Sequence, residues 1–395
     1  GTGITWQSPG GDPLSGTITS MNIDFDNDNN NDISITGIPN ADLVAMTTGN
    51  DLLNEVFGGN DTINGTGFDD YLKGVAGADS ILGNNGDDTL FGGDGNDTLE
   101  GGAGADSLIG GNNNDTLDGI AGSNTLSGGD GNDLLIEGTG TDSMLGGDGN
   151  DTLEVSANFS VVDDSWDGGA GDDDWFDVSG VSNAGREIDL LNGRWELTPG
   201  SATTEPLTGI ENVDGGSGSE TVRGGNANNT VYGNNGNDTI FGNDGFDFLR
   251  GDAGDDSIRG GNDRDTIQGG GGADYLAGDQ GDDEFRYFAG EVDGNDSVFG
   301  NVGDDKLMLW TSGTYDFIGL NLSQLEEIEF RGNGGNQDKT LEIRGDEIND
   351  GFGFAGSFLI DSNGSTGSDD RLEIAMFIDS SINLTTGDFT ADLQL

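Results

Sequence analysis

The chain has 395 residues and a formal net charge of −62, because 75 acidic residues stand against 13 lysine and arginine residues. Histidine and cysteine are both absent, which excludes an imidazole base, a Ser-His-Asp triad, a thiol nucleophile, disulfides and thiolate metal sites. A field this negative repels nucleic acid and anionic membranes, and no apolar run is long enough to span a bilayer, so we expect no nucleic-acid partner and no membrane insertion.

Residues 1–56 precede a repetitive region and are expected to form a β-rich N-terminal cap. Four aspartates in this segment follow the pattern D-x-D-x-D-x-x-x-D, which is the spacing of four ligands in an EF-hand loop: Asp24, Asp26, Asp28 and Asp32. Asn29 replaces the usual glycine, and Ile35 replaces the usual bidentate glutamate. Two interpretations stay open, an isolated calcium loop and a solvated Asx-rich turn.

A nine-residue period runs through residues 57–154, and residues 92–100 (GGDGNDTLE) show it clearly. An acidic or amide residue recurs in one register at Asp61, Asp70, Asp79, Asp88, Asp97, Asp106, Asp115, Asn124, Asp133, Asp142 and Asp151. The residue two positions later is always apolar, as at Leu99. A period held this long predicts a repeat architecture.

A second array occupies residues 215–309 and repeats the same pattern. Its register positions are Glu220, Asn229, Asp238, Asp247, Asp256, Asp265, Asp274 and Asp283, each followed two residues later by an apolar residue. After Phe285 the phase shifts, giving Asp296 with Val298 and Asp305 with Leu307.

The residue types predict an all-β fold, a parallel β-roll in two arrays. A three-residue strand such as Thr98–Glu100 points one side chain inward and two outward, and the glycine-rich turn after it reverses the chain. Two repeats, 18 residues, then form one coil, and coils stack about 4.8 Å apart. Register residues that are 18 positions apart therefore form columns.

Carboxylates stacked in such columns repel each other, by about 1 kcal/mol per pair even in water. Lysine and arginine are too few, and out of register, to neutralise the columns. Aspartate carboxylates and carbonyls of the glycine turns together supply the six to eight oxygen ligands that Ca²⁺ prefers, whereas Mg²⁺ fits less well. The alternative for a single Gly-Asn-Asp turn is Asx hydrogen bonding without a metal. The number of phased turns favours calcium as the cofactor.

The motif Gly-Gly-x-Gly-x-Asp-x-apolar-x resembles the nonapeptide of the RTX family, the hemolysin-type calcium-binding repeats, over residues 57–154, 168–176 and 215–286. The resemblance implies several calcium ions between successive turns, held by the register aspartates of both arrays and by Asp173. Asn124 and Asn229 keep an oxygen but lose charge, Glu220 has a longer arm, and Phe68 replaces a turn glycine. We expect weaker or empty sites there.

Residues 155–214 interrupt the period and carry Trp166, Trp175, Phe176 and Trp195. We expect a β segment that covers an open end of a roll, with an aromatic carbohydrate platform as the alternative. Residues 310–395 alternate apolar and polar residues and are expected to form a C-terminal β domain. RTX proteins leave the cell by type I secretion, and residues 389–395 are compatible with its C-terminal signal or with an ordinary strand.

We therefore expect a secreted protein, extracellular or on the cell surface, that folds when it meets calcium outside the cell. The favoured function is structural or adhesive rather than enzymatic: a self-assembling subunit of an S-layer, sheath or filament, with cell-surface polysaccharide as a further partner. One alternative is a secreted polysaccharide-active enzyme whose repeats serve export and folding. Another is an ice- or glycan-binding protein that uses the column Thr62, Ser80, Thr98 and Thr116, with Thr152 further along.

Overall fold

The computed structural model describes residues 59–156, 164–181, 186–196, 205–288, 290–291, 295–310 and 322–325 with their side chains. Towards the two ends it places the backbone of individual strands, at 3–5, 20–24, 33–36, 313–316, 321, 327–331, 339–342, 352–353, 357–360 and 372–374. All of these elements are strands, so the predicted all-β class is confirmed.

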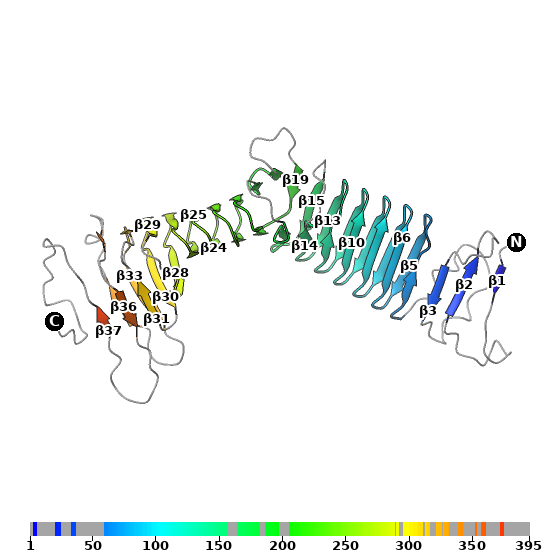
Figure 1. The fold of residues 1–395 in the computed structure, drawn as a ribbon, viewed down its shortest axis with the longest axis horizontal. Helices are drawn as coiled ribbons and strands as arrows, with labels where there is room; N and C mark the ends of the chain where they lie inside the picture. The colour runs from blue at the N-terminus through cyan, green and yellow to red at the C-terminus, as the bar shows by residue number, and fades with distance from the viewer. Residues whose placement is uncertain are drawn as a thin grey trace, which may run out of the picture.

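The strands form an elongated roll whose two walls are hydrogen-bonded sheets (Figure 1). The first sheet contains β4 Thr62–Asn64, β6 Ser80–Asn85, β8 Thr98–Ala103, β10 Thr116–Ala121, β12 Leu134–Ile136, β14 Thr152–Glu154, β16 Trp175–Asp177, β20 Asn212–Asp214, β22 Thr230–Tyr232, β24 Phe248–Ala253, β26 Thr266–Gly271, β28 Glu284–Phe288, β30 Lys306–Trp310 and β33 Glu327–Arg331. Neighbouring strands in this series pair in parallel, as predicted for a β-roll.

The second sheet faces the first across the core. It contains β5 Tyr71–Ala76, β7 Thr89–Asp94, β9 Ser107–Asn112, β11 Thr125–Asp130, β13 Ser143–Asp148, β15 Ser165–Ala170, β19 Glu205–Thr208, β18 Arg194–Glu196, β17 Glu187–Asp189, β21 Thr221–Arg223, β23 Thr239–Asp244, β25 Ser257–Asn262, β27 Tyr275–Gln280, β29 Ser297–Val302, β32 Asn321–Ser323 and β35 Phe352–Gly353.

The coil register is the predicted 18 residues through most of both arrays. Leu99 pairs with Leu117, and Ile240 pairs with Ile258. The apolar residue of every repeat points into the roll, and none of them is more than 2% exposed. The core is therefore a double column of single aliphatic side chains, one from each strand.

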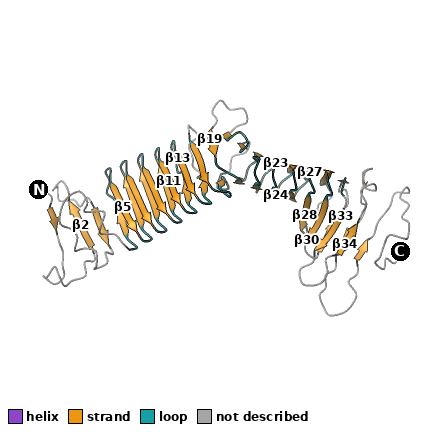
Figure 2. Ribbon diagram, turned by 180° about the vertical axis from the view of Figure 1, so that it is seen from behind, coloured by secondary structure: helices purple, strands orange, loops and turns teal. Residues whose placement is uncertain are grey.

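We expected residues 155–214 to cover an open end of a roll, but the described strands of this segment are built into the roll. The first sheet runs through this segment without a break, because β14 pairs with β16, β16 with β20 and β20 with β22, all in parallel. In the second sheet, β15 pairs in parallel with β19, and an antiparallel run β19–β18–β17 leads on to β21. The two sequence arrays are thus one continuous roll (Figure 2).

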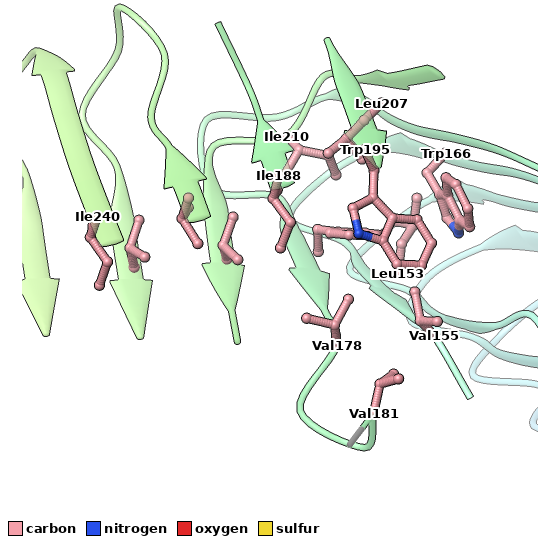
Figure 3. Close-up of a cluster of buried hydrophobic side chains, with 14 of the residues drawn as sticks. Leu153, Val155, Trp166, Val178, Val181, Ile188, Trp195, Leu207, Ile210 and Ile240 are labelled. Atoms are coloured by element: carbon pink, nitrogen blue, oxygen red, sulfur yellow. The ribbon is translucent and has the colours of Figure 1, made fainter. Parts of the chain in front are cut away.

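The core widens where the two arrays meet. Trp166, Phe176 and Trp195 are at most 1% exposed, and their rings pack edge to face with centroids 5.0–5.5 Å apart. Figure 3 shows the two tryptophans with Val155 and Val178 beside them. Three of the four aromatic residues that we considered as a carbohydrate platform thus fill the interior of the roll. Trp175 is only half-buried on the outer face of the first sheet, where it stacks on Tyr232 with the ring centroids 5.6 Å apart.

Antiparallel strands adjoin both ends of the roll, in the segments where we expected β-rich caps. β1 Gly3–Thr5, β2 Ser20–Asp24 and β3 Ile33–Thr36 form a meander that pairs onto β4. At the other end, β34 Lys339–Glu342 pairs onto β33. A separate three-stranded sheet there consists of β31 Gly313–Asp316, β36 Ser357–Ile360 and β37 Leu372–Ile374.

The part of the chain that the structure describes contains no helix long and apolar enough to cross a membrane. The candidate secretion signal at 389–395 lies outside the described residues.

The core geometry predicts unequal costs for two leucine truncations. Leu117 is fully buried in β10, whereas Leu145 in β13 is 43% exposed. We expect Leu117→Ala to destabilise the calcium-loaded protein by about 2–5 kcal/mol, because truncation leaves a cavity between coils. Leu145→Ala is the control and should leave the midpoint of denaturant unfolding nearly unchanged. Equal midpoints for the two variants would contradict this account of the core.

Candidate metal centre

The register residue of each repeat is buried in the turn that precedes a strand. Except for Asp70, which is half-buried, the register aspartates of both arrays are at most 3% exposed. The main-chain N–H of each donates to Oδ1 of the register residue one coil further along. Asp79 N lies 2.8 Å from Asp97 Oδ1, and Asp238 N lies 2.8 Å from Asp256 Oδ1. We call this chain of residues the acidic ladder, and each of its residues a rung.

The second carboxylate oxygen of most rungs has no hydrogen-bond partner. Oδ2 is buried and unpartnered in Asp79, Asp88, Asp97, Asp106, Asp115, Asp133, Asp151, Asp174, Asp238, Asp247, Asp256, Asp265 and Asp283. Buried polar atoms are nearly always satisfied, and a buried charge without a partner is costly. A regular series of such oxygens indicates a missing counter-charge.

The first glycine of each repeat opens the space into which Oδ2 points. A Cβ on Gly92 would stand 2.2 Å from Asp97 Oδ2 and 2.6 Å from the carbonyl oxygen of Gly110. The same cradle recurs in the second array, where a Cβ on Gly251 would stand 2.2 Å from Asp256 Oδ2 and 2.6 Å from the oxygen of Gly269. Glycine is therefore required here for space, and a carboxylate oxygen and a carbonyl oxygen face the same point.

The donor chemistry fits a hard divalent cation. Within the described residues no three acidic side chains converge on one point, so carboxylates alone do not complete a site. Cradles such as those at Gly92 and Gly251 pair a carboxylate with a main-chain carbonyl, and such mixed oxygen donors suit Ca²⁺. When bound, calcium would supply the positive charge that the ladder lacks. The rungs and the glycine carbonyls are the groups that would hold it.

The structure brings together nearly all of the aspartates predicted as ligands. One line of rungs precedes strands of the first sheet: Asp61, Asp79, Asp97, Asp115, Asp133, Asp151, Asp247, Asp265 and Asp283. The other precedes strands of the second sheet: Asp70, Asp88, Asp106, Asp142, Asp238, Asp256 and Asp274.

The prediction of Asp173 is corrected to its neighbour. Asp174 is fully buried, and its Oδ1 accepts the N–H of Asp151 at 2.7 Å. Asp173 is exposed and accepts a hydrogen bond from Asn212 Nδ2 at 2.6 Å. Because residues 172–174 are three aspartates in a row, the sequence alone does not show which of them is the register residue. The apolar residue Phe176 lies two positions after Asp174, and this spacing identifies Asp174.

Four further rungs were not among the predicted ligands: Asp164, Glu211, Asp296 and Asp305. The spacing explains this. Coils of 22 residues lead from Asp142 to Asp164 and from Asp274 to Asp296, and 37 residues separate Asp174 from Glu211. The apolar residue two positions later, such as Trp166, was the available signal.

The predicted N-terminal loop is not tested by the structure. Asp24 is the last residue of β2, and its side chain lies outside the described residues. The other three candidates, Asp26, Asp28 and Asp32, lie outside the described residues altogether.

The amide rungs differ from each other in what they offer a metal. Asn124 Oδ1 accepts the N–H of Asp106 at 3.0 Å, so its Nδ2 faces the cradle, 2.7 Å from where a Cβ on Gly119 would stand. Its oxygen is occupied by the ladder, and an amide N–H₂ cannot bind a cation. Asn229 has the opposite orientation: Nδ2 donates to the main-chain oxygen of Glu211, and Oδ1 lies beside Gly224 and accepts the N–H of Gly225 at 2.7 Å. An oxygen therefore faces the cradle at Asn229, whereas an N–H₂ group faces it at Asn124.

Asx hydrogen bonds without a metal, the alternative for single turns, are also present. The residue before each rung forms a second ladder that runs in the opposite direction. Asn132 N donates to Asn114 Oδ1 at 3.1 Å, and Asn150 N donates to Asn132 Oδ1 at 3.0 Å. These bonds fix the turns, but they leave the Oδ2 atoms of the acidic ladder unpartnered.

Burial sets the titration of the rungs. Desolvation raises the pKa of Asp115 to about 7 and that of Asp265 to about 8, although a main-chain hydrogen bond lowers each. Neighbouring rungs add repulsion, as Asp133 and Asp97 do for Asp115. Glu137 replaces the cradle glycine of its repeat, and burial beside Asp164 and Asp142 raises its pKa to about 9.

These shifts predict that the metal-free protein gains stability on acidification. The folded-state pKa values lie above the unfolded value of about 3.9. At any pH between the unfolded and the folded pKa, the folded state therefore binds more protons than the unfolded state. Without calcium, stability should fall as the pH rises from about 4 through the folded-state values of 6 to 8. Thermal unfolding in chelator at pH 5 and pH 8 measures this. Lower stability at pH 5 would contradict it.

The cradle predicts that one added methyl group blocks a site. In Gly92→Ala the new Cβ occupies the space between Asp97 Oδ2 and Gly110 O, so we expect fewer bound calcium ions and a lower midpoint of unfolding in calcium. Gly271→Ala is the matched control, because no atom lies within 4 Å of its Cβ position. Isothermal titration counts the ions. The same stoichiometry for Gly92→Ala and wild type would rule out this cradle as a binding site.

Comparison with known proteins agrees with the ladder. A family model described as the RTX calcium-binding nonapeptide repeat, four copies, matches residues 56–90, 91–119, 118–153, 214–249, 250–285 and 293–309. The last match contains Asp296 and Asp305, the two rungs that follow the phase shift after Phe285. No protein with a curated description matches the chain. The repeats that form the roll are thus RTX calcium-binding nonapeptide repeats.

Proposed function

We propose that this protein is a secreted structural element of an extracellular surface, which folds on meeting calcium and assembles with copies of itself. The observation that carries the proposal is the continuous acidic ladder, with one buried and unpartnered carboxylate oxygen at most rungs. The roll gains a counter-charge at those oxygens when calcium binds.

Calcium-triggered folding follows from the small apolar core. Each repeat buries one aliphatic side chain, which contributes about 1.5–3 kcal/mol, while ordering the backbone costs about 1–2 kcal/mol per residue. Extracellular calcium modules typically bind the ion at about 10⁻⁴–10⁻³ M. Cytosolic calcium is too dilute to fill such sites, so the chain stays unfolded until it is exported by the type I route used by its family.

Only some of the rungs would bind calcium. We propose that the ligands are the rungs with a free Oδ2, that Asn124 contributes none, and that each ion also contacts carbonyls of the cradle glycines. This assignment rests on the geometry at Gly92 and at Gly251.

The structural role is supported by the shape and the regular faces of the roll. Strands stack in register along a single elongated body (Figure 1). On the outer face of the first sheet, Thr62, Ser80, Thr98 and Thr116 pair in successive strands and form one column. A rigid rod with a repeating polar face suits lateral or head-to-tail packing of identical copies. We propose no catalytic role, in line with the absence of histidine and cysteine.

Electron microscopy and sedimentation in calcium and in chelator test the proposal together. In millimolar calcium we expect full β-structure by circular dichroism and filaments or sheets by negative stain. In chelator we expect loss of most of the β-structure and sedimentation as an expanded monomer. Magnesium at the same concentration is the control and should support neither.

Full β-structure in chelator would refute calcium-triggered folding. Folding in calcium without any assembly at high protein concentration would refute the self-assembling role while leaving the calcium role standing. A screen for depolymerisation of polysaccharides addresses the enzymatic alternative, and activity there would overturn the structural assignment.

A further inference from the structure

Arg186 occupies a position in the roll where the repeats place an aspartate. Arg186 immediately precedes β17, a strand of the second sheet, and its side chain is 0% exposed. β17 pairs in parallel with β21, with Glu187 opposite Thr221. Arg186 therefore lies one coil before Glu220, the register residue of the next repeat.

The main-chain hydrogen bonds confirm this register. Thr221 N donates to the carbonyl oxygen of Arg186 at 2.7 Å. The same bond recurs at each following rung on this side, from Thr239 N to Glu220 O at 2.9 Å and from Ser257 N to Asp238 O at 2.8 Å. Arg186 is thus the terminal rung of this line, in the place of an acidic residue.

The guanidinium lies among oxygen atoms. The point where a Cβ on Gly216 would stand is 3.3 Å from Arg186 Nη1, 3.3 Å from the carbonyl oxygen of Val178 and 2.5 Å from that of Val181. Glu220 is buried at 1% exposure; burial raises the pKa of its carboxyl, and the positive charge of Arg186 opposes that rise. A cation beside a carboxylate and main-chain carbonyls is the arrangement that the glycine cradles prepare for a metal. The longer arm of glutamate at position 220 suits a guanidinium, whose charge is spread over a plane.

We infer that Arg186 is a built-in cation of the acidic ladder, which replaces calcium at the junction of the two arrays and allows the junction to fold without the metal. This inference rests on the proposed calcium-triggered folding and assigns the place where folding begins. Calcium binding then extends the roll from the junction into both arrays.

The packing of the junction supports the same conclusion. Most described coils of the arrays bury one aliphatic side chain per strand, and β28 buries Phe285 and Tyr287 together. The junction packs three large aromatic residues, Trp166, Phe176 and Trp195, against one another at centroid distances of 5.0–5.5 Å. Val178 and Val181, whose carbonyl oxygens lie with Arg186 Nη1 around the Cβ position of Gly216, belong to the same buried core, which Figure 3 shows. Apolar burial and an internal counter-ion, both independent of calcium, thus coincide in one part of the roll.

Hydrogen exchange by mass spectrometry on the full chain in chelator tests the inference. In the wild type we expect protected amides in the described junction strands, at 165–177, 187–196 and 205–223, and rapid exchange in coils far from the junction, such as those of Thr98 and Ser257. In Arg186→Met, exchange around Thr221 in chelator should accelerate about a hundredfold or more, because Glu220 is left buried without its counter-charge. Saturating calcium should restore much of the protection in the arrays of the variant.

Arg223→Met is the matched control. Arg223 lies on β21 next to Thr221, but its side chain is 38% exposed, stacks on Phe241 and bonds Glu187 on the outer face. It should change exchange in chelator only slightly.

Two results would overturn the inference: wild-type protection in chelator that is absent from the junction or strongest elsewhere, and exchange near Thr221 that is unchanged in Arg186→Met. The pattern of protected amides in the wild type tests the inference even if Arg186→Met fails to fold. Failure of the proposed function gives a different pattern, with uniform protection of both arrays in chelator.

Discussion

One carboxylate per repeat, buried in the turn with half of its oxygens unsatisfied, is the constraint on which the rest of this roll depends. The ladder bond uses Oδ1 and holds each rung in place, as between Asp79 and Asp97. The position of that bond forces Oδ2 into the space beside a glycine. The arrangement stabilises the turn and at the same time collects negative charge, so the fold is complete only when positive charge is supplied.

The chain supplies that charge in two ways. Along the arrays the cradles are built from carboxylate and carbonyl oxygens, which suit a divalent ion from solution. At the junction Arg186 takes a rung, and the buried aromatic cluster of Trp166, Phe176 and Trp195 packs close by. A purely acidic ladder would bind metal all along its length or not at all. The arginine divides it into a section that needs the ion and a section that does not.

Much of the fold was predictable from the sequence because the repeat is short and its chemistry is strict. The period of Asp97 and its equivalents specified strand, turn, coil length and core position together. The prediction is wrong where the period changes. It places the rung at Asp173 instead of Asp174 within a run of three aspartates, and it omits Asp164, whose coil has 22 residues. In each case the inward-facing apolar residue two positions later, Phe176 or Trp166, marked the rung better than counting did.

The junction was the least predictable part, for a physical reason. Residues 155–214 lack the repeat, so pattern alone could not distinguish an insert within a roll from a cover at its end. The pairing of β14, β16 and β20 depends on backbone register across 23 and 37 residues, which no local signal encodes. The role of Arg186 is visible only after that register is known.

The unequal coil lengths have a consequence for how such a rod can vary. Coils of 18, 22 and 23 residues stack in the same sheets with the same ladder bonds, as the rungs at Asp97, Asp164 and Asp174 show. Each of these coils adds one strand to each sheet, so its contour is free to grow without adding a strand along the axis. Foreign peptides grafted between Asp142 and Asp164 would therefore lengthen a coil sideways and leave the stacking of the strands unchanged.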